Sequence, residues 1–401
     1  MDSSHDLIQN VYTYFLNAYR HAAPDASGGE IVAFEAIGFS PGCSTLTGTN
    51  VAAAALEEVS HFTDPLPQID GGIYTRTMRT ISGTYGNMLD AAEPSSSASI
   101  VTFSDLKSQA QEAYKATLGS FDGPTSYHPT YPMPIDWYDL TNAANWLSYS
   151  YDASAQTPAP APPAPVAPNI RVQWHILPQE VRPLILQRPI QVRPPTLESN
   201  AHPMYMSAQT VPNREIVTNI MAPAVASAHV GPMTLTRPIE LTGLASVAKI
   251  ATQTQTQPIE TPKFTMSFDY CLVQLRRPWF SGDLLATLGW YVPGAHRGDY
   301  ASGGPTNAGP FAVVPTAFIA VKNLVIDAAW SDSDAAARAN AAAFGPFSLL
   351  GLSTDDKNAM HCPGLQIIAW ICSLQPQLPP DTDPALTTAV ATPPGVAPGS
   401  T

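Results

Sequence analysis

Charged side chains are scarce in this sequence. Asp, Glu, Lys and Arg make up 13% of its 401 residues, about half of the share that is usual for soluble proteins. Acidic residues outnumber basic ones, 32 against 19, which gives a formal net charge of −13 at pH 7. Such a chain is not attracted as a whole to nucleic-acid phosphates or to an anionic bilayer. We therefore expect no nucleic-acid partner.

Cysteine is rare, and its spacing matches neither a zinc site nor a redox motif. Cys43, Cys271, Cys362 and Cys372 are scattered, and the sequence has no Cys-x-x-Cys pair. This usage indicates free thiols in a reducing compartment, with disulfide pairing left open. No other cluster of metal-ligand residues has a recognisable spacing, and we expect neither a metal nor a cofactor.

Long apolar runs and secretory signals are also missing. No stretch approaches the ~20 apolar residues of a membrane helix. The first residues, Met1–Asp6, lack the basic start and apolar core of a signal peptide. There is no Asn-x-Ser/Thr acceptor site. We expect a protein made in the cytoplasm, with release by a non-classical route left open.

Catalytic motifs fail when they are tested chemically. The segment Gly38–Gly42 fits the pattern G-x-S-x-G of a serine nucleophile. In that motif the residue after the serine donates its backbone N–H to the oxyanion, but here that residue is Pro41, which has no N–H. No phosphate-binding glycine loop, H-E-x-x-H or dinucleotide motif is present. The motifs favour a non-catalytic protein.

Proline, by contrast, is abundant, with 41 residues. Six prolines fall between Gln156 and Asn169, and each fixes φ and removes a backbone donor. A polyproline spacer rises by about 3.1 Å per residue, so its two ends would lie on the order of 40 Å apart. This stretch predicts a linker at 156–169 between two separately folded units.

The hydrophobic periodicity differs on the two sides of this linker and predicts an α+β protein. Residues 1–155 are predicted to be a mostly helical unit, with helices at 4–21, 50–62 and 104–119, a strand at 31–37, and a strand or helix start at 73–82. Residues 170–377 are predicted to be an antiparallel β-rich unit, sandwich or barrel-like. Residues 378–401 are rich in Pro and Thr and are predicted to be a disordered tail.

The predicted β-rich unit rests on apolar and alternating segments separated by Pro and Gly. Its strands are expected at 170–176, 184–192, 233–241, 263–276, 316–328 and 365–374, with an alanine-rich helix at 334–344. Strict Thr/Gln alternation at Thr252–Gln257 is competent to form a strand but polar on both faces. We interpret it as an exposed edge strand or loop. Pairing with a neighbouring subunit, or rearrangement as in pore-forming toxins, are the alternatives.

Aromatic residues crowd between residues 127 and 151 beside carboxylates. A sugar site has this composition, because rings stack on C–H faces while carboxylates accept hydroxyl protons. Packing of the rings into a core is the competing interpretation. The candidate ligand-binding residues are His128, Asp136, Trp137, Tyr138, Asp139 and Trp146. His128 with Asp136 or Asp139 is also a conceivable acid/base set.

These observations favour a non-catalytic assembly or protein-interaction protein. It would self-associate, or dock on another protein, through β edges and neutral polar surfaces, because burying such surfaces desolvates little charge. Two alternatives remain: a membrane-acting β-rich pore-forming toxin, and a glycan-binding or glycan-active protein that uses residues 127–151.

Overall fold

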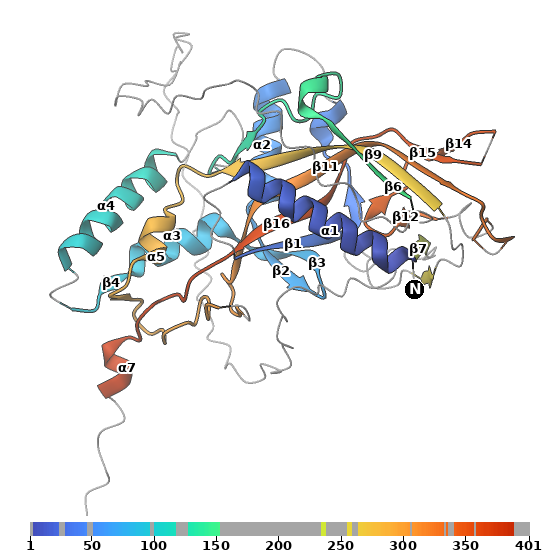
Figure 1. Ribbon diagram of the computed structural model, residues 1–401. Helices are drawn as coiled ribbons and strands as arrows, with labels where there is room; N and C mark the ends of the chain where they lie inside the picture. The colour runs from blue at the N-terminus through green and yellow to red at the C-terminus, as the bar shows by residue number, and fades with distance from the viewer. Residues whose placement is uncertain are drawn as a thin grey trace, which may run out of the picture. The chain divides into compact units, whose positions relative to one another are not determined.

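The computed structural model describes residues 3–23, 29–45, 51–96, 100–117, 127–152, 234–237, 255–258, 264–304, 307–332, 334–335, 341–356 and 358–388. Two compact units divide the chain: Met1–Pro163 with Pro223–Thr401, and Ala164–Ala222. All the described residues belong to the first unit, which is drawn in colour in Figure 1.

The helices of this unit come mostly from the N-terminal half of the chain (Figure 1). They are α1 (Ser3–Ala22), α2 (Val51–Thr63), α3 (Ile81–Ala91), α4 (Ile100–Ala116), α5 (Gly282–Ala286) and α7 (Pro384–Thr388), with 3₁₀ turns η1 (Gly42–Thr45) and η2 (Ala143–Asn145). None of the helices in the described ranges is long and apolar enough to cross a membrane.

Ten strands form one mixed sheet at the centre of the unit. They are β1 (Glu30–Phe39), β2 (Pro65–Asp70), β3 (Ile73–Thr80), β5 (Tyr131–Met133), β6 (Leu147–Asp152), β9 (Phe264–Arg276), β11 (Val313–Ala328), β14 (Ser353–Thr354), β15 (Met360–Cys362) and β16 (Gln366–Leu374). The path runs β14-β15-β11-β16-β1-β3-β2. Strand β9 pairs with β11, and it also pairs with β5 and β6. Only the β1–β3 pair is parallel among these pairings.

The sheet joins strands from both sides of the proline-rich stretch. Strand β1 pairs with β16 from Glu30↔Ser373 onward, and β6 pairs with β9 from Leu147↔Tyr270 onward. These pairings cross the boundary of the predicted division into a helical unit 1–155 and a β-rich unit 170–377. Local periodicity identifies a strand but not its partner, and here each partner lies far away in the sequence. The predicted linker at 156–169 lies outside the described residues.

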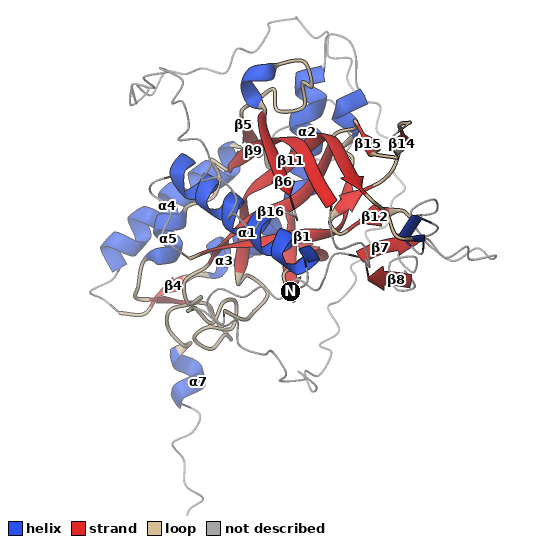
Figure 2. Cartoon of the chain, turned by 45° about the vertical axis from the view of Figure 1, so that its right-hand side comes forward, coloured by secondary structure: helices blue, strands red, loops and turns tan. Residues whose placement is uncertain are grey.

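The α+β class is confirmed, and the described strands of the main sheet form one mixed sheet with helices against it. Helix α1 crosses one face of the sheet (Figures 1 and 2). Its side chains Leu7, Val11 and Phe15 recur at a spacing of four and are fully buried there. Tyr14 and Tyr270 join their hydroxyls by a hydrogen bond of 2.9 Å under this helix.

The opposite face of the sheet is covered by α2 and the loop that connects β5 to β6. On β11, Ile319 faces the α1 side, while its neighbour Phe318 faces the α2 side. Phe318 packs edge-on against Phe62 of α2 and Trp137 of the loop, at ring-centroid distances of 5.7 and 4.9 Å. Alternation along the central strands thus places apolar side chains in both cores, as expected of a sheet buried on both faces.

A third apolar core lies between α3, α4, α5 and the segment that follows β9. Figure 2 places these three helices together beside the sheet. Leu378 is fully buried in this core and forms an isolated antiparallel β-bridge with Ala301. Asp383 accepts a hydrogen bond of 2.7 Å from the backbone N–H of Gly294. The expectation of a disordered tail from residue 378 is therefore wrong for 378–388, because Leu378 supplies an apolar anchor; residues 389–401 lie outside the described ranges.

Most predicted elements inside the described ranges are confirmed, with ends that shift by a few residues. The predicted segment 73–82 contains both a strand, β3, and the start of a helix, α3. The alanine-rich helix predicted to reach residue 344 is wrong at its end, since Ala343–Phe344 forms strand β12. Strand β12 pairs with Phe347–Ser348 (β13), because Gly345–Pro346 turns the chain back.

A small four-stranded sheet has the order β13-β12-β7-β8, where β7 is Thr234–Arg237 and β8 is Gln255–Pro258. Strand β8 is the second half of the Thr/Gln segment and stands at the end of this sheet. The predicted edge strand is thus confirmed over those residues. The strands expected at 170–176 and 184–192 lie outside the described residues.

All four cysteines are free and buried. Burial raises the pKa of the Cys362 thiol to about 11 and that of Cys271 to about 12. The pairing that the sequence left open is absent. The Cys271 and Cys362 thiols are therefore protonated at neutral pH.

Candidate functional site

Five of the six candidate residues lie in the loop between β5 and β6. Trp137 is fully buried, with its ring against Phe318. Tyr138 is half-buried and lies edge-on to Trp137 at 6.2 Å. Trp146 is 9% exposed, and the Nζ atom of Lys322 lies 4.4 Å from its ring centroid. Internal contacts therefore account for the burial of the Trp137 and Trp146 rings, whereas Tyr138 stays partly exposed.

The two carboxylates of this loop hold the loop itself together. Asp136 accepts hydrogen bonds from the side-chain amides of Asn142 (2.6 Å) and Asn145 (2.8 Å). Asp139 accepts one from the hydroxyl and one from the backbone N–H of Thr141. The hydroxyl bond is the largest of several effects that lower the pKa of Asp139. These contacts close the turns that place Trp137 and Trp146 on the sheet.

His128 lies apart from that loop, on the helical side of the unit. Its ring stacks on the Tyr114 ring of α4, with 4.0 Å between the ring centroids. The Trp279 ring lies tilted to it, with 5.2 Å between the centroids. Burial lowers the pKa of His128, and nearby Asp64 opposes the shift. Within the described residues, no hydrogen bond joins His128 to Asp136 or Asp139. The acid/base set considered from the sequence is not assembled there.

A buried ion pair that the sequence analysis did not single out lies where β1 and β3 separate. Glu35 of β1 is 6% exposed and accepts a hydrogen bond of 2.6 Å from the Trp370 indole. Arg76 of β3 donates to the same carboxylate oxygen at 2.6 Å. The guanidinium also lies 4.5 Å from the Phe39 ring centroid. The sequence contains one indication of a buried charge here, because Glu35 is the sole charged residue in the apolar run 31–37.

The geometry of the sheet explains why an arginine lies at this point. Strand β1 pairs with β3 only at Phe34↔Ile73 and Glu35↔Tyr74. Beyond that point β1 follows β16 to Phe39, while β3 continues beside β2. The side chain of Arg76 lies near the Phe39, Tyr74 and Trp370 rings, at 4.5 to 5.4 Å. Its charge is balanced by Glu35, so we interpret the arrangement as a structural ion pair.

The buried Glu35 carboxyl should make the stability of the fold depend on pH. Burial raises the pKa of Glu35 above its ordinary value of 4.5, and Arg76 and Trp370 only partly oppose this. The pKa of Glu35 is therefore higher in the folded state than in the unfolded state. The protonated group contributes its full stabilisation at a pH below its pKa in the unfolded state. It is lost as the pH rises through the folded pKa. We expect wild type to lose stability relative to Glu35→Gln as the pH rises from 4.5, measured by urea unfolding; a constant difference would contradict the assignment.

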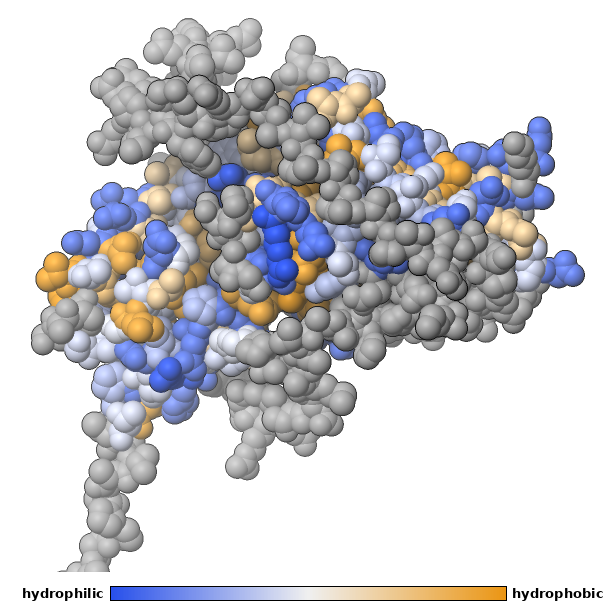
Figure 3. Space-filling view, in the orientation of Figure 1, coloured by the Kyte–Doolittle hydropathy of each residue, from blue (hydrophilic) through white to orange (hydrophobic). Residues whose placement is uncertain are grey.

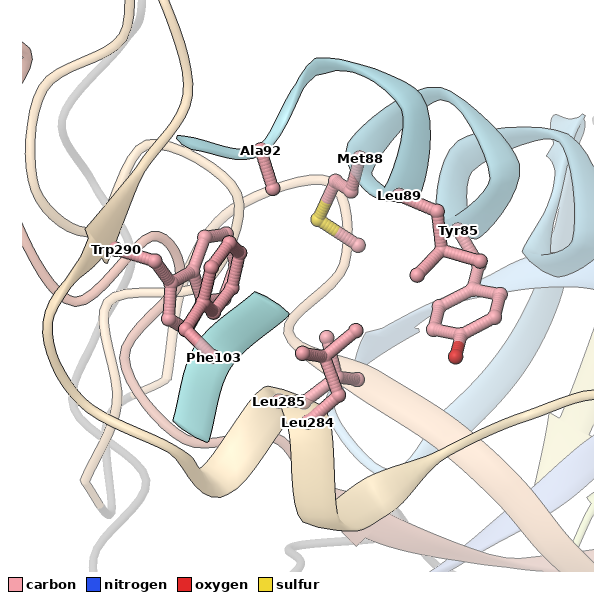
Figure 4. Close-up of a pocket in the computed structure, with 8 residues that line it drawn as sticks. All are labelled: Tyr85, Met88, Leu89, Ala92, Phe103, Leu284, Leu285 and Trp290. Carbon is pink, nitrogen blue, oxygen red and sulfur yellow. The ribbon is translucent and has the colours of Figure 1, made fainter. Parts of the chain in front are cut away.

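The cavity in Figure 4 lies elsewhere, between α3, α4 and α5. It measures about 10 Å³, room for about one water molecule. Its lining residues are Tyr85, Met88, Leu89, Ala92, Phe103, Leu284, Leu285 and Trp290. The side chains in Figure 4 converge on it without a charged group. In the parts of the chain that the structure describes, no group of His, Cys, Asp and Glu could hold a metal ion.

The strand edges differ in how well they are protected against pairing with another chain. Strand β2 carries Pro65 and Pro67, β5 carries Pro132, and β8 ends at Pro258; β13 and β14 have two residues each. Proline and short length both discourage edge pairing. Strand β6 (Leu147–Asp152) has six residues without proline or lysine, and among the described strands only β9 pairs with it.

Side chains on β6 alternate between the two faces of the sheet. Leu147, Tyr149 and Tyr151 stand opposite residues of β9 that face α1. Leu147 is 47% exposed, whereas Tyr149 is buried against Phe268. Ser148 and Ser150 are exposed on the other face. Leu147 is therefore an uncovered apolar side chain at the start of this strand.

The chain was compared with protein-family models, with curated proteins and with solved structures. No protein-family model, no curated protein and no solved structure matches the chain.

Proposed function

We propose that this is a non-catalytic assembly protein whose principal partner is a second copy of itself. The observation that carries the proposal is the set of exposed apolar side chains on β5, on β6 and on the loop between them, among them Leu147, which is 47% exposed. Exposed apolar surface of this kind marks sites of interaction with other proteins. The proline-rich stretch 156–169 acts as a spacer in this proposal.

The character of the surface supports the same function. Only 13% of residues are charged, so contact between copies desolvates few charges. On the face seen in Figure 3, hydrophobic residues form several separate patches among polar ones. Exposed apolar side chains gather around the β5–β6 region: Tyr131, Met133, Ile135, Leu140 and Leu147. A surface of this composition suits association with a like surface.

The oligomeric state tests this proposal. Size-exclusion chromatography with light scattering on the full chain should give a mass at least twice 42.7 kDa at micromolar concentration. A strict monomer up to the highest concentration reached would refute self-assembly. Dye release from liposomes and binding to a glycan array, run on the same preparation, test the toxin and glycan alternatives.

A further inference from the structure

We propose that a bulge on β3, residues 77–79, docks on an apolar patch of a second copy that is formed by Ile100, Val101 and Leu288. This inference rests on the proposed self-assembly and adds to it a contact between two different surfaces. Such a contact joins copies head to tail, so the copies either close into a ring or continue as an open chain.

The bulge lies at the end of β3, directly before α3. Strand β3 pairs with β2 at Arg76↔Pro67 and again at Thr80↔Pro65. Residues 77–79 of β3 therefore stand opposite a single residue of β2. Extra residues on one strand of a pair bend that strand and redirect its side chains, and bulges of this kind recur beside functional surfaces.

The bulge presents an apolar side chain next to a positive charge. Met78 is 101% exposed, more than any other large apolar side chain in the described ranges. The Thr77 hydroxyl accepts a hydrogen bond of 3.3 Å from the backbone N–H of Arg79 and lies 3.4 Å from its carbonyl oxygen, to which it donates. These bonds hold the bulge in one shape, which lowers the entropy cost of docking. Methionine adapts to the surface that it meets, and Arg79 is exposed beside it.

The apolar patch lies where α4 begins and α5 ends. Val101 is 70% exposed, Leu288 77% and Ile100 45%. Phe103 follows Val101 by two residues and Trp290 follows Leu288 by two, and these rings stack with their centroids 6.0 Å apart. The stacking brings the two exposed segments together. Figure 3 shows hydrophobic residues on the surface at the end of the unit where Figure 1 draws α4 and α5.

Exposed acidic residues lie on the helices that form this patch. Asp105 follows Val101 by four residues, so the two exposed side chains are neighbours on one face of α4. Asp283 is exposed on α5, and Asp90 is exposed in the last turn of α3. Carboxylates of this kind complement the charge of Arg79. The same chain therefore carries both halves of a complementary pair, and a second copy is the partner that supplies the missing half.

The two surfaces cannot meet within one copy, because α3 holds them apart. Thr80 caps the start of this helix by accepting a hydrogen bond of 3.1 Å from the backbone N–H of Gly83. Near its other end, Met88 and Leu89 are buried in the same core as Phe103 and line the same cavity (Figure 4). Eleven residues separate the ends of α3 by about 16 Å. Docking of the bulge therefore requires another copy.

Two variants, each altered on one surface, test this contact by complementation. Met78→Asp alters the bulge and leaves the patch intact, whereas Val101→Asp/Leu288→Asp alters the patch and leaves the bulge intact. Leu350→Asp is the control, because Leu350 is 80% exposed outside both surfaces. Since all these side chains are exposed, each variant should keep the wild-type urea midpoint at protein concentrations well below the dissociation constant.

We expect Met78→Asp and the double patch variant each to raise the dissociation constant of this contact at least about tenfold, because a charge replaces an apolar side chain that docking buries. Sedimentation of the full chain should then show smaller species than wild type gives. An equimolar mixture of the two variants should reach a larger mass than either alone, because the intact bulge of one meets the intact patch of the other. Leu350→Asp should keep the wild-type mass.

The remaining outcomes overturn the contact in distinguishable ways. If wild type is oligomeric and neither altered surface changes its mass, docking of the bulge is refuted while self-assembly stands. If both variants are smaller but their mixture gains no mass, the two surfaces do not meet each other. An equal loss with Leu350→Asp would assign the effect to added negative charge and refute the contact. A monomeric wild type refutes this contact and the proposed function together.

Discussion

Arg76→Met will destabilise the protein by about 3 kcal/mol at pH 7. Removing one partner of a buried pair leaves an uncompensated charge and costs about 3–5 kcal/mol. The low end applies because 30% of the Arg76 side chain remains exposed. Glu35 would keep only the indole of Trp370 as a strong donor, and the stacking of the guanidinium on Phe39 would be lost. Urea unfolding followed by tryptophan fluorescence measures the change.

Arg79→Met is the matched control for this prediction. Arg79 lies three residues further on and is exposed on the same strand, so its replacement should change stability by no more than about 0.5 kcal/mol. The double variant Arg76→Met/Glu35→Gln should recover much of the loss, because it removes the buried charge as well. Equal effects of Arg76→Met and Arg79→Met would show that the ion pair does not stabilise the sheet.

Trp137→Ala is the second large effect, with an expected loss of about 3–5 kcal/mol. The side chain is fully buried and fills the space between Phe318 and Phe62. Its removal leaves a cavity that the rigid sheet closes only in part. Tyr131→Ala is the aromatic control, because Tyr131 is 39% exposed; we expect it to cost under about 1 kcal/mol.

The same variant separates the two interpretations of the aromatic residues. If Trp137 packs the loop onto the sheet, stability falls and a glycan array gives the same result before and after the change. A variant that keeps wild-type stability and loses glycan binding would restore the sugar-site interpretation. The contacts of the buried Trp137 ring with Phe62 and Phe318 favour the first outcome.

Sequence patterns identified elements well where burial follows a regular period. Helix α1 and the strands β9, β11 and β16 lie close to the predicted ranges. The sequence shows the cluster of aromatic residues at 127–151, but composition alone does not distinguish a packed core from a binding face. Trp137 and Trp146 proved to be covered by Phe318 and Lys322, residues that lie far away in the sequence.

Pairing between distant segments explains the main differences. Strand β1 joins a parallel contact with β3 to an antiparallel contact with β16, and nothing in residues 30–39 specifies either partner. The Glu35–Arg76 pair depends on the point at which β1 and β3 separate. Each feature is a property of the assembled sheet, which single-sequence periodicity does not describe.

The position of β16 between β1 and β11 has a consequence for biosynthesis. While the ribosome is still making the chain, β1 lacks its antiparallel neighbour, and it gains this neighbour only after Gln366–Leu374 has emerged. Shortening the C-terminus past Leu374 would therefore remove the strand that links the early and late portions of the polypeptide. A cut in the interval 153–233 would instead leave every strand of the main sheet whole. Because β1 pairs with β16 and β6 with β9 across the cut, two separately expressed fragments could reassemble.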